Sequence, residues 1–451
     1  MRLPRGRLIV WAAAWFVPAA LLAALAPELA GALYALAVLA MAAPAYDALR
    51  AGESLRGVEA ELPALTRMTK AADGQLTVRL ANADRRARRI RFGIPMPGEL
   101  GCAQEDISVD LPAGAEHSTV TLDCLPRRRG SYRLEEVYLG AVSPWGFWLA
   151  RRRQRRGAEV RVYPNLKGER KRMAAMFLNR GAFGLHAQRQ IGQGREFEQL
   201  RPYIRGDAYQ DIHWKATAKR GRPATKMYQI ERTQEVYVLI DASRLSARQP
   251  TAEVDADERL LVPPNMLERF ITAALVFGAV AERQGDLFGV GSFSDRVDRF
   301  VRARNGQTHY RACRDALYSL HARPVSPDFA ELFSFLHLRL RRRALLVFLT
   351  NLDDPILSET FSEHVGLLAR RHVVLVNQLS PPGVGPLFSG RDVANVDDVY
   401  ERLGGHLQWR RLRETHRRLS HRGVQFHLPT NETLCPEIVT QYLNVKRRQL
   451  L

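Results

Sequence analysis

Two apolar runs at the N-terminus constrain this chain more than any other feature of its sequence. Residues 8–26 carry no charged side chain, and residues 29–46 are apolar again after a two-residue break. Each run is close to the roughly 20 residues that an α-helix needs to cross the hydrocarbon core of a bilayer. The sequence therefore predicts a hairpin of two transmembrane helices within residues 1–50.

A cleaved signal peptide is the alternative, because Ala24-Leu25-Ala26 resembles a cleavage site. Pro27 would then directly follow the cut, and the second apolar run begins almost at once. Both features favour a membrane hairpin that is retained in the mature protein.

Basic residues flank both ends of this hairpin, whereas its turn carries only Glu28. The flanking cations are Arg2, Arg5, Arg7, Arg50 and Arg56. Because such cations favour the cytoplasmic side, both ends of the hairpin are predicted to lie there. We therefore expect a protein of the bacterial inner (cytoplasmic) membrane, with its soluble region in the cytoplasm and facing the anionic lipid of the inner leaflet.

The formal charge of +20, mostly from arginine, implies an anionic surface nearby. The lipid membrane supplies one, and the sequence lacks a known nucleic-acid-binding motif, so no nucleic-acid partner is expected. Four cysteines are too few for a disulfide framework. Cys102 and Cys124 can pair in an oxidising compartment, whereas reduced thiols are expected in the cytoplasm.

The soluble region contains two different patterns of polar and apolar residues. Within residues 57–165, short segments of alternating polarity are separated by clusters of glycine, proline and aspartate, which predicts a small β-sandwich. Within residues 233–451, apolar runs alternate with helical patterns, which predicts a doubly wound parallel sheet. The predicted fold class is thus α/β plus all-β. Ligands bind at the carboxyl ends of such strands, where Asp241 and the pair Thr350-Asn351 are expected.

A distinctive connector separates these domains, within residues 185–232. Its characteristic residues are Arg201, Tyr203, Gly206, Asp207, His213, Trp214 and Lys215. This segment resembles the signature of the domain of unknown function 58 family. The resemblance extends over about residues 140–451, and includes Ser143-Pro144-Trp145-Gly146-Phe147, Asp241-Ala242-Ser243-Arg244, Phe293-Ser294-Asp295 and Tyr442-Leu443.

The resemblance implies a von Willebrand factor type A-like domain on a membrane anchor. Such proteins are typically associated with a MoxR-type AAA+ ATPase and a transglutaminase-like membrane protein, and the family has no established catalytic activity. We therefore expect a protein-binding adaptor in cell-envelope or complex assembly, and no enzyme. This chain has no glycine-rich phosphate loop of its own, which excludes an ATPase.

Domains of this type often hold Mg²⁺ through Asp-x-Ser-x-Ser, a threonine from a later loop and an aspartate after the fourth strand. Here Asp241 and Ser243 are present, but Leu245 replaces the second serine and Asn351 the last aspartate. The loop 324–328 has proline where the threonine is usual, while Asp353 and Asp354 lie close enough in sequence to substitute. A degenerate site without a cofactor is expected, and a Mg-dependent ligand-binding module is the alternative.

A polar and acidic insertion at 249–264 follows Asp241 and suggests a lid over this site. A second alternative is a hydrolase that uses the Asp207–Lys215 segment, where Asp207, His213 and Lys215 lie close in sequence. The favoured interpretation of that segment is structural, with Ile212 and Trp214 packed inward and the charged residues at the surface.

Overall fold

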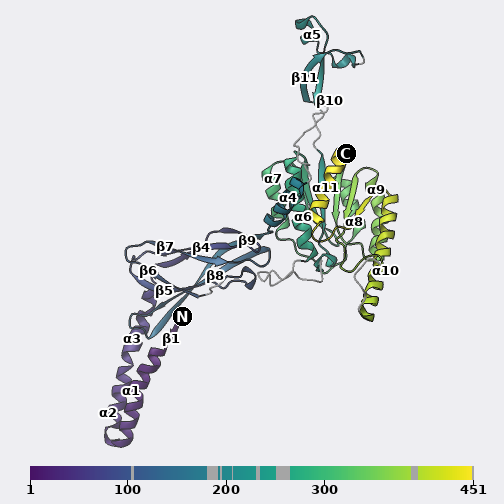
Figure 1. The fold of residues 1–451 in the computed structure, drawn as a ribbon. Helices are drawn as coiled ribbons and strands as arrows, with labels where there is room; N and C mark the ends of the chain where they lie inside the picture. The colour runs from purple at the N-terminus through teal and green to yellow at the C-terminus, as the bar shows by residue number, and fades with distance from the viewer. Residues whose placement is uncertain are drawn as a thin grey trace. The chain divides into compact units, whose positions relative to one another are not determined.

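The structure is a computed structural model that describes residues 1–102, 106–179, 191–192, 196–205, 207–229, 234–249, 265–387 and 395–448. These residues form two compact units, one of Met1–Asn165 and one that begins at Leu166 (Figure 1). Gly206 of the predicted signature and all but the first residue of the predicted lid lie outside the described residues.

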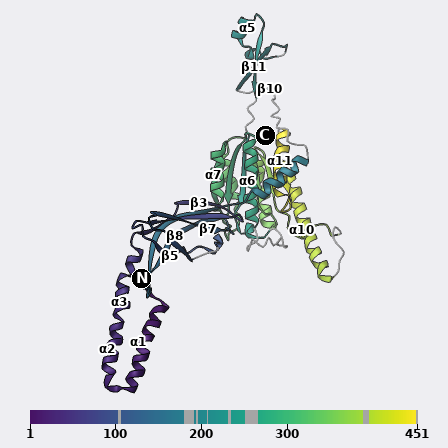
Figure 2. The ribbon, with the colours of Figure 1, turned by 60° about the vertical axis from the view of Figure 1, so that its left-hand side comes forward.

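The N-terminal unit begins with two long apolar helices, seen at its end in Figures 1 and 2. The first is α1 (Gly6–Leu25), and the second span is Pro27–Leu55, which includes α2 (Ala30–Ala40) and α3 (Ala42–Arg50). Only 11% of the most apolar window of each is buried, so these side chains face outward as lipid-facing side chains do. The two helices form the membrane anchor, and the second continues beyond the predicted limit at residue 46.

A short strand before α1 ties the N-terminus to the sandwich. β1 (Arg2–Pro4) pairs antiparallel with the start of β9 (Trp148–Tyr163), so that Arg2 lies opposite Ala150. Because one sheet holds both segments, the residues before α1 and those after α3 lie on the same side of a bilayer. A cut after Ala26 would remove an edge strand of this sheet, which further favours a retained hairpin.

The sandwich packs two mainly antiparallel sheets over one apolar core. The larger sheet contains β1, β9, β8 (Gly130–Val142), β5 (Arg88–Gly93) and β6 (Asp106–Leu111), with β3 (Leu65–Thr69) pairing with β9. The smaller sheet contains β2 (Val58–Glu61), β4 (Gly74–Asn82) and β7 (His117–Cys124). Alternate residues of β4, such as Leu76 and Val78, are fully buried, as the alternating pattern predicted.

A disulfide joins Cys102 to Cys124 in this sandwich. The two residues also form an isolated antiparallel backbone bridge. Since the backbone itself brings the residues together, the pair is adjacent whether the sulfur atoms are oxidised or reduced. Their proximity therefore leaves open the compartment in which this unit lies.

Asp47, within α3, fixes the second membrane helix to the sandwich. Its buried carboxylate accepts hydrogen bonds from Ser143 Oγ at 2.5 Å and from the backbone N–H groups of Trp145 and Phe147 at 3.1 and 3.2 Å. Trp148 Nε1 donates to the carbonyl oxygen of Pro44 at 2.7 Å. The Ser143–Phe147 landmark of the family resemblance thus serves as the socket for an anchor helix.

The C-terminal unit contains a six-stranded sheet in the order β15-β14-β13-β16-β17-β18. Its strands are β13 (Glu235–Asp241), β14 (Leu287–Phe293), β15 (Val297–Arg304), β16 (Ala344–Leu349), β17 (Val373–Asn377) and β18 (Gln425–His427). In chain order this is 3-2-1-4-5-6, the doubly wound arrangement that the alternation of strands and helices predicted. Sequence analysis did not predict β15, the antiparallel edge strand, because its residues alternate with charged side chains.

Helices cover both faces of this sheet (Figures 1 and 2). One core holds residues of α4 (Lys167–Asn179), α6 (Met266–Arg283), α7 (Gln307–Leu317) and α11 (Leu434–Arg447). The other holds residues of α8 (Phe329–Arg339), α9 (Pro355–Ala369) and α10 (Val396–His421). Close packing explains Gly289 of β14, where a Cβ atom would lie 2.7 Å from the ring of Tyr237.

The Tyr442 landmark has a structural role. Its hydroxyl donates a hydrogen bond to the buried carboxylate of Asp286, just before β14, and Lys446 Nζ lies 2.9 Å from the same carboxylate. Burial, followed by the charge of Asp286, raises the pKa of the Tyr442 hydroxyl. The last helix is therefore attached to the sheet by a buried polar contact as well as by apolar packing.

Candidate functional site

The carboxyl edge of the sheet is organised around Asp241, the last residue of β13. Its side chain is fully buried, and both carboxylate oxygens are occupied. Oδ1 accepts the backbone N–H of Ser243 at 2.8 Å, and Oδ2 accepts the hydroxyl of Thr350 at 2.6 Å. Burial raises the pKa of the Asp241 carboxyl, while the bonds from Thr350 and Ser243 act in the opposite direction.

The loop after Asp241 closes on itself through its own hydroxyls. Ser243 Oγ accepts the N–H of Leu245 at 3.4 Å, at the start of a short 3₁₀ turn. Ser246 Oγ donates to the carbonyl oxygen of Asp241 at 2.6 Å. Leu245, at the position of the second serine, is 2% exposed and places an alkyl chain where a hydroxyl ligand is usual.

The polar side chains of the neighbouring loops also accept hydrogen bonds from within the protein. Asn351 Oδ1 accepts the N–H of Asp353 at 2.8 Å. Asp353 accepts a hydrogen bond from Gln378, and Asp354 caps α9 by accepting the N–H of Ile356 at 3.0 Å. The loop 324–328 contributes backbone, since the Val325 carbonyl oxygen accepts the N–H of Arg244 at 2.9 Å.

This set of donors does not fit a magnesium ion. Mg²⁺ requires several oxygen ligands in near-octahedral geometry, usually including charged carboxylates. At the expected ligand positions the edge offers one carboxylate that is already bonded twice, one serine hydroxyl and a neutral amide, while the nearby carboxylates of Asp353 and Asp354 bond to Gln378 and to the start of α9. Within the part of the chain that the structure describes, no group of three or more His, Cys, Asp or Glu side chains is placed to hold a metal.

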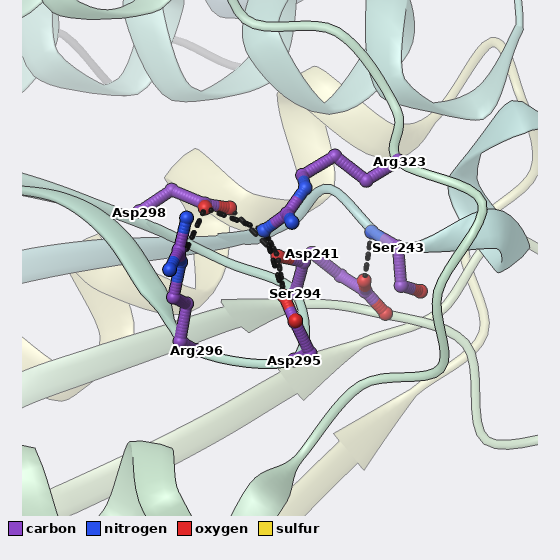
Figure 3. A network of polar contacts seen from close by, with 7 residues as sticks. All are labelled: Asp241, Ser243, Ser294, Asp295, Arg296, Asp298 and Arg323. Atoms are coloured by element: carbon purple, nitrogen blue, oxygen red, sulfur yellow. Dashed lines mark hydrogen bonds and ion pairs between the residues drawn. The ribbon is translucent and has the colours of Figure 1, made fainter.

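A second polar network borders Asp241 and explains the Phe293-Ser294-Asp295 landmark (Figure 3). Arg323 Nη1 donates to Asp295 Oδ1 at 2.7 Å, to Asp298 Oδ1 at 3.1 Å and to Ser294 Oγ at 3.0 Å. The backbone N–H of Arg323 also donates to the carbonyl oxygen of Ala242 at 2.7 Å. Arg323 thereby clamps the β14–β15 turn to the Asp241 loop.

The signature connector folds into a small module of its own. β11 (Glu196–Pro202) pairs antiparallel with β12 (Ala224–Gln229), which also pairs with β10 (Ile191–Gly192). A 3₁₀ turn (Tyr209–Asp211) and the short helix α5 (Trp214–Arg220) connect β11 to β12. We use the name signature module for residues 191–192, 196–205 and 207–229.

The charged signature residues hold this module together. Arg201 Nη2 donates to Asp207 Oδ1 at 2.5 Å, while Asp207 Oδ2 accepts the N–H of Ile204 at 3.1 Å and the hydroxyl of Thr225 at 3.2 Å. The bond from the Ile204 N–H, followed by that from Arg201, lowers the pKa of the Asp207 carboxyl. His213 caps α5, because its Nδ1 accepts the N–H of Ala216 at 3.0 Å.

The apolar signature residues correct one prediction. Ile212 is 7% exposed and packs inward as expected, but the side chain of Trp214 is 56% exposed. Ile212 forms a backbone bridge with Thr225 of β12, whereas Trp214 lies beyond this strand pairing, at the first residue of α5. The Trp214 ring instead makes an edge-on contact with Tyr209, at 5.3 Å between ring centroids.

Four large apolar side chains of this module are exposed, and two of them, Tyr209 and Trp214, are in contact. The four are Tyr203 (37% exposed), Ile204 (62%), Tyr209 (73%) and Trp214 (56%). Exposed apolar side chains that lie close together on a soluble domain often mark an interaction surface. We call these four residues the aromatic surface.

Comparison with known proteins shows which family part of the chain resembles. Residues 199–383 match the family model described as protein of unknown function DUF58. This confirms the resemblance to that family. The match begins inside the signature module and extends to the loop after β17, so it includes both the aromatic surface and the Asp241 edge. A search of curated proteins found no match.

Solved structures show weak overall similarity to this chain. PilB minor pilin from Streptococcus sanguinis is 10% identical, with 81% of this chain and 89% of that chain covered at a TM-score of 0.34. BatB from Bacteroides thetaiotaomicron is 14% identical, with 48% and 99% covered at 0.30. The SpRpn10 VWA domain is 8% identical, with 46% and 94% covered at 0.26. The α/β unit has the von Willebrand factor type A-like fold, as the strand order indicates.

Sequence analysis missed the structural roles of three residues. Thr350 was expected at the carboxyl edge, but not as the partner of Asp241. Arg323 and Asp47 were not singled out at all, although each organises a family landmark. The sequence offered one signal for Asp47, because it is a single acidic residue at the end of the second apolar run.

Proposed function

We propose that this protein is a membrane-anchored adaptor whose aromatic surface binds a partner protein. The observation that supports this proposal is the outward position of Tyr209 and Trp214 on a module whose charged signature residues bond to one another. Tyrosine and tryptophan are enriched among the residues that dominate binding energy at protein interfaces. An adaptor needs such a surface and needs no reacting group.

The hydrolase alternative has less support. Nucleophilic or general-base chemistry needs a side chain that is free to exchange a proton with substrate. Asp207 accepts three hydrogen bonds, and the Nδ1 atom of His213 is used by the helix cap. Both side chains therefore have a structural role, Asp207 in joining segments of the module and His213 in capping α5, and this role accounts for their presence in the signature.

A MoxR-type AAA+ ATPase is the partner that the family resemblance favours, and a transglutaminase-like membrane protein is a second. The described residues of the signature module contain seven Lys or Arg and four Asp or Glu, a difference of three positive charges. An acidic surface would therefore complement the module electrostatically, which mainly accelerates association.

The test is a pull-down from detergent extract with the full-length tagged chain, run with and without ATP. Trp214→Ala and Tyr209→Ala are expected to lower recovery of the ATPase by about tenfold or more, as truncation of a central aromatic residue does. Leu338→Ala, which removes an exposed apolar side chain from α8, is the matched control. Equal recovery with all three variants would refute the role of the aromatic surface.

We also propose that the soluble region faces the cytoplasm of an inner membrane. The support is the set of basic flanks and the β1–β9 pairing, which puts both flanks on one side. A cytoplasmic reporter fused after Leu451 should be active and a periplasmic reporter inactive. Alkylation in intact cells should find Cys102 and Cys124 reduced; a fully oxidised pair together with an active periplasmic reporter would reverse the orientation.

A further inference from the structure

Helix α10 exposes an apolar stripe along its N-terminal half. The stripe has the spacing i, i+3, i+4, i+7 and i+11, so its members share one face of the helix. They are Val396 (69% exposed), Val399 (47%), Tyr400 (69%), Leu403 (44%) and Leu407 (48%). The C-terminal half attaches to the α/β domain by other residues, since Leu412, Thr415 and Leu419 are buried.

The same face becomes strongly basic in the C-terminal half of α10. At 3.6 residues per turn, Arg410, Arg417 and Arg418 continue the line of the stripe, and Arg411 lies at its margin. Glu414 also lies there, but it is paired with Arg418 at 3.2 Å. Towards the N-terminus, Asp398 is engaged in the capping box and Glu401 projects from the opposite side of the helix. The face therefore consists of an apolar half and an arginine half.

We propose that this face of α10 docks on an anionic lipid surface. The apolar half suits the boundary between headgroups and acyl chains, and the arginines suit the headgroup phosphates. Because α1 and α2 anchor the chain in a bilayer, such a surface is always available to it. Tethering also raises the effective concentration of the lipid surface, so that a short stripe is sufficient.

The charge pattern favours lipid over a second copy of the chain. Two copies of α10 aligned in parallel would place their arginine halves against each other. Antiparallel copies would place an arginine half against an apolar half. Full-length self-pairing is unfavourable in both directions, whereas one anionic bilayer surface complements both halves at once. This inference concerns a different surface from the proposed adaptor site and does not depend on it.

The experiment places a reporter on each side of α10 in the full-length chain. Leu403→Cys lies in the stripe, and Glu401→Cys on the opposite side is the matched control. Each is labelled with an environment-sensitive fluorophore in nanodiscs of phosphatidylcholine alone or of phosphatidylcholine with phosphatidylglycerol. The unsubstituted chain measures background labelling, which is subtracted from both variants; Cys313 and Cys435 should contribute little to it because they are buried.

The fluorophore at residue 403 should shift to the blue and be quenched by nitroxide-labelled lipid, only in the discs with phosphatidylglycerol. The fluorophore at residue 401 should respond little in either lipid. High salt should reverse the shift, because attraction of the arginines to an anionic surface is screened. Identical responses at residues 401 and 403 in anionic discs would overturn the proposal.

Two further measurements identify the surface that covers the stripe. Arg410→Glu with Arg417→Glu should lower the docked fraction at least about tenfold, since each basic residue near the lipid contributes appreciably to binding. The control is Arg342→Glu, at an exposed position before β16. If residue 403 is protected only in discs that hold two copies of the chain, α10 binds another copy and the lipid proposal is wrong.

Discussion

The carboxyl edge of the α/β sheet and the signature module use similar residues in opposite ways. At the edge, Asp241, Thr350 and Asn351 are buried and bonded to other parts of the same domain. In the module, Asp207 and His213 bond locally while Tyr209 and Trp214 remain exposed. The edge, where this fold usually binds a ligand, is closed, and the connector has the surface that is available to a partner. The fold therefore indicates where a binding site can lie. Whether the polar side chains at that place are available to a ligand depends on whether they already hydrogen-bond within the protein.

The largest expected effect tests whether the edge is closed. Thr350→Val removes the hydroxyl that donates to Asp241 and leaves a buried carboxylate oxygen without a partner. We expect the free energy of unfolding to fall by about 3 kcal/mol or more, measured by denaturant titration of the full-length chain. Thr360→Val, which removes an exposed hydroxyl bonded to the Ile356 carbonyl, should cost less than about 1 kcal/mol. Equal costs would mean that the Asp241 edge is open.

A slightly smaller effect comes from His372, before β17, which is 3% exposed and whose Nδ1 accepts the N–H of Ala344 at 3.2 Å. Burial, with Arg371 and other cations nearby, lowers its pKa from 6.5 to about 4. The folded state thus disfavours the protonated ring, so stability is present above pH 6.5 and is lost as the pH falls towards 4. The loss should reach at most about 3 kcal/mol.

His372→Asn is the control for this pH dependence, because its side-chain oxygen can still accept a hydrogen bond but does not titrate. Thermal unfolding of the two proteins should diverge as the pH falls from 6.5 towards 4, with the unsubstituted chain losing more stability. Parallel curves over that range would show that His372 is not buried as a neutral ring. The stability of the signature module, whose aromatic surface is uncharged, should have the same pH dependence in the two proteins.

A still smaller effect is expected for Trp214→Ala in the signature module. Because the side chain is 56% exposed, its removal should cost less than about 1 kcal/mol of stability. Ile212→Ala, two residues earlier and 7% exposed, should cost about 2 to 4 kcal/mol. Local hydrogen exchange of β11 and β12 measures both. A larger cost at Trp214 than at Ile212 would restore the inward orientation that the sequence suggested.

The smallest expected signal concerns magnesium at the closed edge. Calorimetry should detect no Mg²⁺ binding at millimolar concentrations, because Asp241 is occupied and Leu245 supplies no oxygen. Leu245→Ser with Asn351→Asp restores a hydroxyl and a carboxylate and should strengthen binding. Tight binding by the unsubstituted protein, lost in Asp241→Ala, would show that the edge opens and would favour the cation-dependent alternative.

Much of the fold was predictable because the relevant signals are local. Apolar run length predicted the anchor helices, and the alternation of runs with helical patterns predicted the doubly wound sheet. The strand β15 escaped prediction because its charged residues follow no simple burial pattern. At the candidate sites, Asp241, Ser243 and the signature residues were identified by type and spacing. Their partners were not, because spacing carries no information on distant contacts.

The sequence by itself determined the membrane hairpin, the order of domains and the identity of the signature, since hydropathy and motif spacing are properties of neighbouring residues. Only the tertiary structure decided which polar groups are occupied. Asp241 meets Thr350 across 109 positions, and Asp47 meets Ser143 across 96. It also decided that Trp214 faces outward, because that depends on where the strand pairing of Ile212 ends and α5 begins. Hydrogen-bond satisfaction and exposure arise from contacts between segments, and no local pattern encodes them.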